Sequence, residues 1–136
     1  MKKIAVIDDD IYIGDMVEEI LKKEGYSVLR AYSGTEAVYL LKEHRPDLIL
    51  LDLMLPGLTG EQVLPLVQGI PVIVVSAKAD VADKVKLLRD GAADYITKPF
   101  DTRELLSMCS FARRLPWEAV KALFSGSLGW IRPAGA

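Results

Sequence analysis

Cysteine and histidine are almost absent from this sequence, and their scarcity excludes several classes of protein. The single cysteine, Cys109, cannot form a disulfide within the chain or build a cysteine-based metal cluster. The single histidine, His44, excludes a histidine-rich metal site. For Cys109 we expect a small apolar residue packed on a helix, and for His44 a surface residue at a helix end. The sequence therefore excludes disulfide frameworks and sites built on several cysteines or histidines.

Long apolar runs and a secretory leader are also missing. The run Leu48–Leu51 ends at Asp52, and no run approaches the length of about 18 residues typical of a membrane span. Only four apolar residues separate the N-terminal lysines from Asp8, too few for a signal peptide. The chain has 136 residues, of which 51% are hydrophobic and 26% charged, as in a single globular domain. We expect a cytoplasmic protein without membrane association.

Acidic residues are scarce near the C-terminal end of the chain, so the net charge changes sign along the sequence. Residues 1–107 carry 13 Lys/Arg and 18 Asp/Glu, net −5, whereas residues 108–136 carry 4 and 1, net +3. Both tryptophans lie in the second segment. Four basic residues so widely spread are too few to predict nucleic-acid binding. Because Pro116 should end the last helix near Leu115, we expect a globular domain over residues 1–115 and an atypical tail over 116–136, with no DNA-binding domain and no direct DNA binding.

Short apolar runs alternate with amphipathic stretches through the first 107 residues. The runs predict strands at 4–7, 27–31, 48–51, 72–75 and 95–97. In the stretches between them, apolar residues recur at the spacing of one face of a helix. Strands that alternate with helices predict an α/β fold with a parallel sheet covered on both faces.

The expected helices carry clear start signals and apolar faces. Candidate capping pairs are Ser33 with Glu36, Thr59 with Gln62, and Asp101 with Glu104. The first helix should bury Ile13, Met16, Val17, Ile20 and Leu21, and the fourth Val81, Val85 and Leu88. Pro65 predicts that the third helix is short or distorted.

Polar side chains follow four of the five predicted strands, at the point where each strand ends. They are Asp8, Asp9 and Asp10 after the first strand, Asp52 after the third, Ser76 after the fourth and Lys98 after the fifth. Ligands of open α/β sheets bind outside the carboxyl ends of the strands. We therefore expect these side chains to converge on one site.

The charges of this site demand a cation. Two carboxylates about 4 Å apart repel by about 4 kcal/mol in a partly screened site, and Lys98 alone cannot neutralise the cluster. Mg²⁺ can, because it binds carboxylates and leaves room for a phosphate oxygen. Asp10 is expected to serve the following helix as an N-terminal residue instead. Asp52, beside a metal, a hydroxyl and an ammonium group, is equipped to accept a phosphoryl group as an acyl phosphate.

Four ordered motifs resemble the receiver domain of bacterial two-component response regulators, and most closely the OmpR/PhoB type. The motifs are Val6–Asp10, Leu51–Gly57, Val75–Ala77 and Asp94–Phe100. The resemblance covers about residues 2–107. It implies a flavodoxin-like, doubly wound sheet of five strand–helix units with strand order 2-1-3-4-5.

The resemblance also implies a role for each residue of the cluster. Asp52 matches the phosphoacceptor, which receives its phosphoryl group from a sensor histidine kinase. Asp8, Asp9 and the backbone carbonyl of Met54 match the ligands of Mg²⁺. Ser76 matches the switch hydroxyl, Tyr95 the switch aromatic residue and Lys98 the lysine of the pocket. A cis peptide bond between Lys98 and Pro99 is expected as well. The domain would catalyse its own phosphorylation and dephosphorylation rather than act as a conventional enzyme.

Two other functions compete with this interpretation. A haloacid-dehalogenase-like phosphatase would use Asp8 as its nucleophile, but Tyr12 replaces the expected threonine or valine and Asp52 would have no role. A receiver-like binding module that never takes phosphate would lack an acidic residue or the lysine, and here none is missing.

Homodimerisation and a role in transcription regulation are further implications of the OmpR/PhoB resemblance. Such receivers pair through the fourth helix, fifth strand and fifth helix, and Lys84 and Glu104 match one ion pair of that face. A second pair is missing, since Ala93 and Met108 stand at its positions. The tail, with a helix expected after Pro116, should pack on this face or on a second subunit, because large apolar side chains favour burial by about 1.5–3 kcal/mol each.

Overall fold

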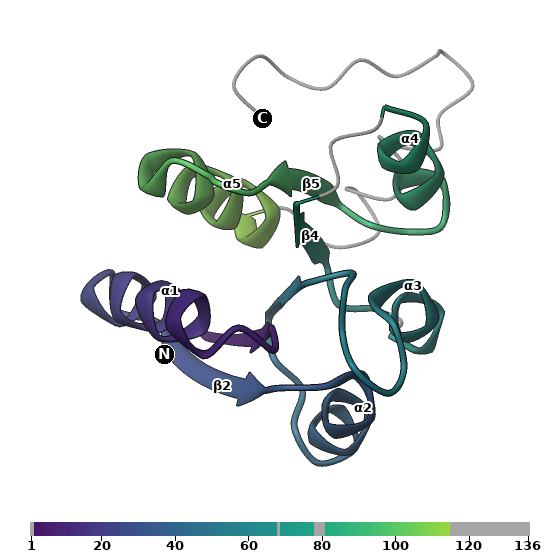
Figure 1. Cartoon of the computed structure of the whole chain (residues 1–136). Coiled ribbons are helices and arrows are strands. Elements are labelled where there is room, and N and C mark those ends of the chain that lie inside the picture. The colour runs from purple at the N-terminus through teal and green to yellow at the C-terminus, as the bar shows by residue number, and fades with distance from the viewer. Residues whose placement is uncertain (1, 68, 78–80, 115–136) are drawn as a thin grey trace.

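A five-stranded parallel sheet forms the centre of the protein, as the computed structural model shows for residues 2–67, 69–77 and 81–114. The strand order is β2-β1-β3-β4-β5, and every neighbouring pair is parallel (Figure 1). The strands are β1 (Lys3–Ile7), β2 (Ser27–Ala31), β3 (Leu48–Leu51), β4 (Val72–Ser76) and β5 (Asp94–Thr97). The predicted flavodoxin-like fold is therefore confirmed.

Helices cover both faces of the sheet. On one face α1 (Ile11–Lys23) and α5 (Thr102–Arg114) lie side by side (Figure 1). On the other lie α2 (Gly34–Glu43), α3 (Gly60–Val63) and α4 (Val81–Arg89), and a single 3-10 turn, η1 (Leu64–Leu66), follows α3. Because each crossover returns the chain to the same edge of the sheet, the loops after β1, β3, β4 and β5 gather there.

The strand β3 shows why the sheet is apolar on both sides. Its four residues are all buried. Leu48 and Leu50 pack in the cluster that includes Leu21 of α1 and Leu105 of α5, whereas Ile49 and Leu51 pack in the cluster on the opposite face. Side chains of a strand alternate between the two faces, so a strand between two helical layers has no position left for water.

The predicted helix caps and the predicted distortion at Pro65 are present in the structure. The Ser33 hydroxyl accepts a hydrogen bond from Glu36 N at the start of α2, and Thr59 and Gln62 form a complete capping box at the start of α3. The expected distortion at Pro65 is confirmed, because α3 has only four residues and passes into η1 at that proline. Cys109 is fully buried and His44 is an exposed C-terminal cap of α2, both as predicted.

Two apolar residues do not face the core as predicted. Met16 is 46% exposed and Val85 is 43% exposed. The buried stripe of α1 runs through Gly14, Val17 and Leu21, and Met16 lies about 100° around the helix from Val17. Among residues 84–89 of α4, whose side chains the structure describes, Leu87 is buried instead, so the face turned to the sheet is rotated from the predicted one, and the side chain of Val81 lies outside the described part.

The ends of the elements differ little from the predicted ends. Ser76 is the last residue of β4 rather than the first residue after it. The helix α5 ends at Arg114, and the predicted tail over 116–136 lies outside the described residues. Within the described part of the chain, no helix has both the length and the apolar character that crossing a membrane requires.

Glycine at position 60 lets α3 approach the loop that follows β3. Gly60 N donates to Leu53 O, and a Cβ at Gly60 would lie 2.4 Å from the Asp52 carbonyl oxygen. We predict that Gly60→Ala lowers the free energy of unfolding by about 1–3 kcal/mol, because the backbone must move. Gly14→Ala is the comparison variant: its Cβ would meet the end of the Arg30 side chain, which pairs with Asp15 and Glu18 but can shift more easily than backbone, so its loss should be smaller. Urea unfolding measures both, and equal losses would contradict the argument.

Candidate functional site

Two buried carboxylates stand at the carboxyl edge of the sheet, on adjacent strands. Asp8 follows β1 and Asp52 follows β3, and they are 5% and 6% exposed. Asp8 N donates to Ala31 O, and Asp52 N donates to Ile7 O at 2.9 Å. Hydrogen bonds of the sheet edge therefore fix the backbone of both residues, which sets where their carboxylates lie.

Lys98 joins the two carboxylates. Its Nζ lies 2.8 Å from Asp8 Oδ2 and 3.0 Å from Asp52 Oδ2. The lysine comes from the loop after β5, and the peptide bond to Pro99 is cis, as predicted. The structure thus brings Asp8, Asp52 and Lys98 together at one site, as predicted.

The second oxygen of each carboxylate is held by backbone. Asp8 Oδ1 accepts a hydrogen bond from Asp10 N, and Asp52 Oδ1 accepts one from Met54 N at 3.1 Å. Asp10 itself is the N-cap of α1 and accepts from Tyr12 N and Ile13 N. Asp10 is therefore engaged with the helix, as expected, and both buried carboxylates are held in one orientation.

Burial and charge shift the pKa values of this cluster. Burial raises the pKa of Asp52 above its usual range, and the neighbouring charge of Asp8 adds to this, although hydrogen bonds from Met54 N and Lys98 oppose it. Burial lowers the pKa of Lys98, but its hydrogen bonds to Asp8 and Asp52 outweigh that and raise it. The lysine therefore stays charged, while the charged form of Asp52 is less favourable than that of an exposed aspartate.

The acidic residues fit a divalent metal. One carboxylate oxygen from each of Asp8, Asp9 and Asp52 lies within 4.8 Å of the others. Asp9 is exposed, so it can turn toward an ion from the solvent side. Hard oxygen donors in this number suit Mg²⁺, which keeps several waters and binds through few carboxylates. Three carboxylates against one ammonium leave excess negative charge, and a metal would relieve it.

The predicted switch residues lie on the two strands beyond β3. Ser76 is fully buried at the end of β4, and Tyr95 on β5 is 5% exposed. The ammonium group of Lys84 lies 5.4 Å from the centre of the Tyr95 ring, a cation–π contact that sequence reasoning did not foresee. Lys84 therefore bridges α4 to the aromatic residue that was expected to move.

The predicted dimer face contains Lys84 and Glu104, but they do not pair with each other among the described residues. Glu104 is exposed on α5. Ala93 and Met108, at the positions of the missing second pair, are both buried.

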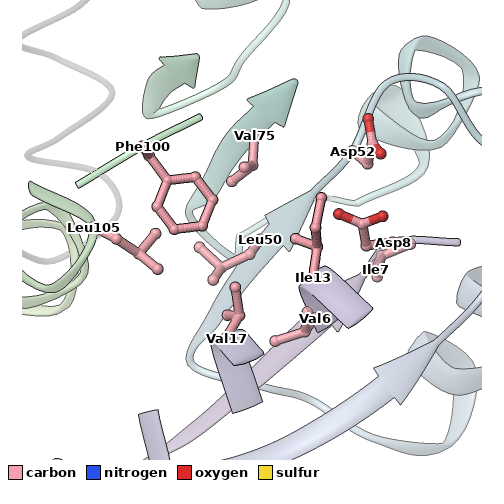
Figure 2. A pocket seen from close by; sticks show the side chains of 10 residues that line it. All are labelled: Val6, Ile7, Asp8, Ile13, Val17, Leu50, Asp52, Val75, Phe100 and Leu105. Carbon is pink, nitrogen blue, oxygen red and sulfur yellow. The ribbon is translucent and has the colours of Figure 1, made fainter. Parts of the chain in front are cut away.

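A small apolar cavity lies directly beneath the two carboxylates. Its volume is about 10 Å³, about the room of one water molecule. Figure 2 shows Asp8 and Asp52 at one end and the ring of Phe100 at the other, with Leu105 beside it. The sequence signal that could have indicated it is Phe100, an aromatic residue directly after the Lys98–Pro99 pair. The apolar walls account for the desolvation of Asp52.

We predict that the raised pKa of Asp52 is visible in the stability of the metal-free protein. The folded state holds a proton on Asp52 at a pH where the unfolded chain has released it, so this contribution is present in acid and is lost as the pH rises through the raised pKa. The melting temperature of Asp52→Asn, relative to that of the unchanged protein, should therefore rise as the pH is raised from about 4 to about 7.

Thermal unfolding in EDTA, followed by circular dichroism, measures this difference. Glu43→Gln, which changes an exposed carboxyl at the end of α2, is the matched control and should show no comparable trend. A difference between Asp52→Asn and the unchanged protein that stays constant with pH would contradict the prediction.

Solved receiver structures resemble this chain over nearly all of their length. The receiver domain of a Francisella response regulator is 30% identical, with a TM-score of 0.80, over 84% of this chain and 98% of that one. A CheY-like receiver domain protein from Methanospirillum hungatei is 32% identical, with a TM-score of 0.79, over 84% and 94%. The BeF₃-activated receiver domain of Klebsiella pneumoniae RstA is 29% identical, with a TM-score of 0.79, over 84% and 100%.

The family model for the response regulator receiver domain matches residues 4–110. The matches do not favour a haloacid-dehalogenase-like phosphatase with Asp8 as its nucleophile, whereas a receiver gives the buried cluster of acids and lysine a function. Receiver domains are phosphorylated on an aspartate by histidine kinases. This chain belongs to the response regulator receiver domain family.

Proposed function

We propose that Asp52 is the phosphoacceptor of this receiver, in a Mg²⁺-dependent reaction with a sensor histidine kinase in the cytoplasm. The observation that carries the proposal is the position of Asp52 in the middle of the sheet. The strand before it, β3, lies between β1 and β4. Asp52 therefore has the acidic pair of β1 on one side and the hydroxyl of Ser76 on the other.

Asp8 does not combine these neighbours. Its strand lies between β2 and β3, so it has no hydroxyl residue of β4 beside it. Asp8 and Asp9 are suited instead to hold the metal, with an oxygen of Asp52 and, as the resemblance implies, the carbonyl of Met54. Bound there, Mg²⁺ would neutralise charge on the phosphoryl oxygens.

The transfer itself is a substitution at phosphorus. A carboxylate oxygen of Asp52 forms the new bond to phosphorus, and the bond from phosphorus to the kinase's imidazole nitrogen breaks. Lys98, held 3.0 Å from Asp52 Oδ2, can bind a phosphoryl oxygen once the carboxylate has become an acyl phosphate and lost its negative charge. The Ser76 hydroxyl donates to another phosphoryl oxygen. The chain's own residues thus orient the nucleophile and compensate the charge that moves onto it.

Phosphorylation of Asp52 would change the conformation of the surface formed by α4, β5 and α5. Movement of Ser76 toward the phosphoryl group opens space that the Tyr95 ring fills, and α4 follows through the Lys84 contact to that ring. We propose that this face forms an OmpR/PhoB-type homodimer, with Lys84 and Glu104 of the two subunits paired, and that the dimer serves transcription regulation. The supporting observations are the exposure of Glu104 and the position of Lys84 beside Tyr95.

We predict that Asp52→Asn abolishes phosphorylation by acetyl phosphate, because an amide cannot form the acyl phosphate. Intact-mass spectrometry, with Mg²⁺ and with EDTA, measures the added phosphoryl group. Asp10→Asn is the matched control: it removes a charge from the same acidic run, and asparagine caps a helix as well as aspartate does. The control should be phosphorylated normally. Equal modification of Asp52→Asn would overturn the assignment.

A second prediction concerns the dimer face. Lys84→Met keeps the apolar stem and removes the charge, so BeF₃⁻-dependent dimerisation should weaken by about two- to thirtyfold, because a symmetric dimer holds two such exposed ion pairs. Glu104→Gln should weaken the dimer as well, and the two changes together should cost less than the sum of the single losses, while Lys84→Met should exceed Glu104→Gln only by its contact with Tyr95. Light scattering in Mg²⁺ and BeF₃⁻ measures the dimer. Strictly additive effects would contradict a direct pair between these residues.

A further inference from the structure

Thr97, the last residue of β5, carries a hydroxyl group with no partner. Its Oγ1 is shielded from solvent and makes no hydrogen bond within the part of the chain that the structure describes. A buried polar atom without a partner has lost its hydrogen bonds to water and gained none in return. Such groups are rare in folded proteins, and each one calls for an explanation.

The position of Thr97 supplies that explanation. In the pairing of β4 with β5, Thr97 lies directly opposite Ser76, and the next residue, Lys98, donates its N–H to Ser76 O at 2.8 Å. Tyr95 and Val74 pack on the face of the sheet covered by α2–α4, whereas Ile96 and Val75 pack on the other. Because side chains alternate along a strand, the side chains of Ser76 and Thr97 both lie on the same face of the sheet as that of Tyr95.

The hydroxyl-bearing side chains of these two neighbours are thus within reach of each other. Adjacent strands are about 4.8 Å apart, so a change of rotamer can bring one hydroxyl within hydrogen-bond distance of the other. In the structure described here that bond is not made, since Thr97 Oγ1 has no partner. The structure shows the arrangement without the bond, and the spacing of the two strands leaves room for one with it.

We propose that Thr97 is a positioning residue for the Ser76 switch, whose hydroxyl becomes hydrogen-bonded to Ser76 when a phosphoryl group occupies Asp52. The proposal rests on the proposed function, since it requires Ser76 to donate to the phosphoryl oxygen. A hydroxyl has a single proton and two lone pairs. When Thr97 donates to Ser76 Oγ, the only proton of Ser76 is left free to point at the phosphoryl oxygen.

The two hydrogen bonds reinforce each other. A hydroxyl that accepts a bond becomes a better donor, and chains of such bonds strengthen in a low-dielectric interior. The unmodified domain carries the unfavourable, unpaired hydroxyl, and the phosphorylated domain does not. Thr97 therefore biases the switch toward the phosphorylated arrangement without touching the phosphoryl group, Mg²⁺ or the kinase.

The test is the affinity for BeF₃⁻ with Mg²⁺, measured by fluorine NMR on the full chain. Thr97→Val has nearly the same shape and lacks the hydroxyl, so it should fold and bind BeF₃⁻ about five- to tenfold more weakly. Thr97→Ser restores the hydroxyl and should bind within about twofold of the unchanged protein. Thr102→Val, at an exposed threonine on α5, is the matched control and should not change the affinity.

The melting temperature and a double-mutant cycle with Ser76 distinguish a positioning role of Thr97 from a purely structural one. Thr97→Val should raise the melting temperature of the unmodified domain by about 2–4 °C, since the unpaired hydroxyl is gone, and should reduce the further rise caused by BeF₃⁻. Ser76→Ala should abolish the affinity difference between threonine and valine at position 97, because the partner is absent.

The outcomes separate this proposal from the proposed function. If the unchanged protein binds BeF₃⁻ and Thr97→Val binds it equally well, the role of Thr97 is overturned and the phosphoacceptor assignment stands. An affinity loss that persists in the Ser76→Ala background also overturns it, since the effect then does not pass through Ser76. If the unchanged protein does not bind BeF₃⁻ with Mg²⁺, both proposals are overturned.

Discussion

The ion pair from Lys98 to Asp8 and Asp52 ties together the three chain segments on which the site depends. The lysine is 90 residues from Asp8 and 46 from Asp52 in sequence, so the contact exists only when β1, β3 and β5 are in place. Two buried carboxylates repel each other, and one ammonium group is their compensation among the described residues. The site keeps an excess of negative charge, which favours a divalent metal, and the metal in turn would offset the negative charge of a phosphoryl group.

Much of this arrangement could be predicted from the sequence, because it follows from topology. Once strands and helices alternate, the residues after the strands must meet at one edge, and Asp8, Asp52 and Lys98 stand at those positions. Motif resemblance added what topology alone does not specify, namely the strand order and the cis bond before Pro99. Both were confirmed.

What could not be predicted depends on the packing of particular side chains. Helical spacing places Met16 and Val85 on apolar stripes, but the rotation of each helix against the sheet decides which residues at the edge of a stripe are buried. The contact of Lys84 with Tyr95 and the unpaired hydroxyl of Thr97 depend on rotamers. No pattern in the sequence distinguishes a threonine that has a partner from one that lacks it.

The acidic run after β1 shows how much depends on the order of identical residues. Its three aspartates have three different surroundings: Asp8 is buried against Lys98, Asp9 faces solvent, and Asp10 caps α1. A deletion of one aspartate would leave two of the three aspartates in place. It would nevertheless shift the start of α1 by one residue and so rotate the helix by about 100°. Composition would hardly change, whereas the buried stripe of Gly14, Val17 and Leu21 would turn away from the sheet. The spacing of this run is therefore under a stricter constraint than its charge, because the same residues set both the position of the ligands and the phase of the helix.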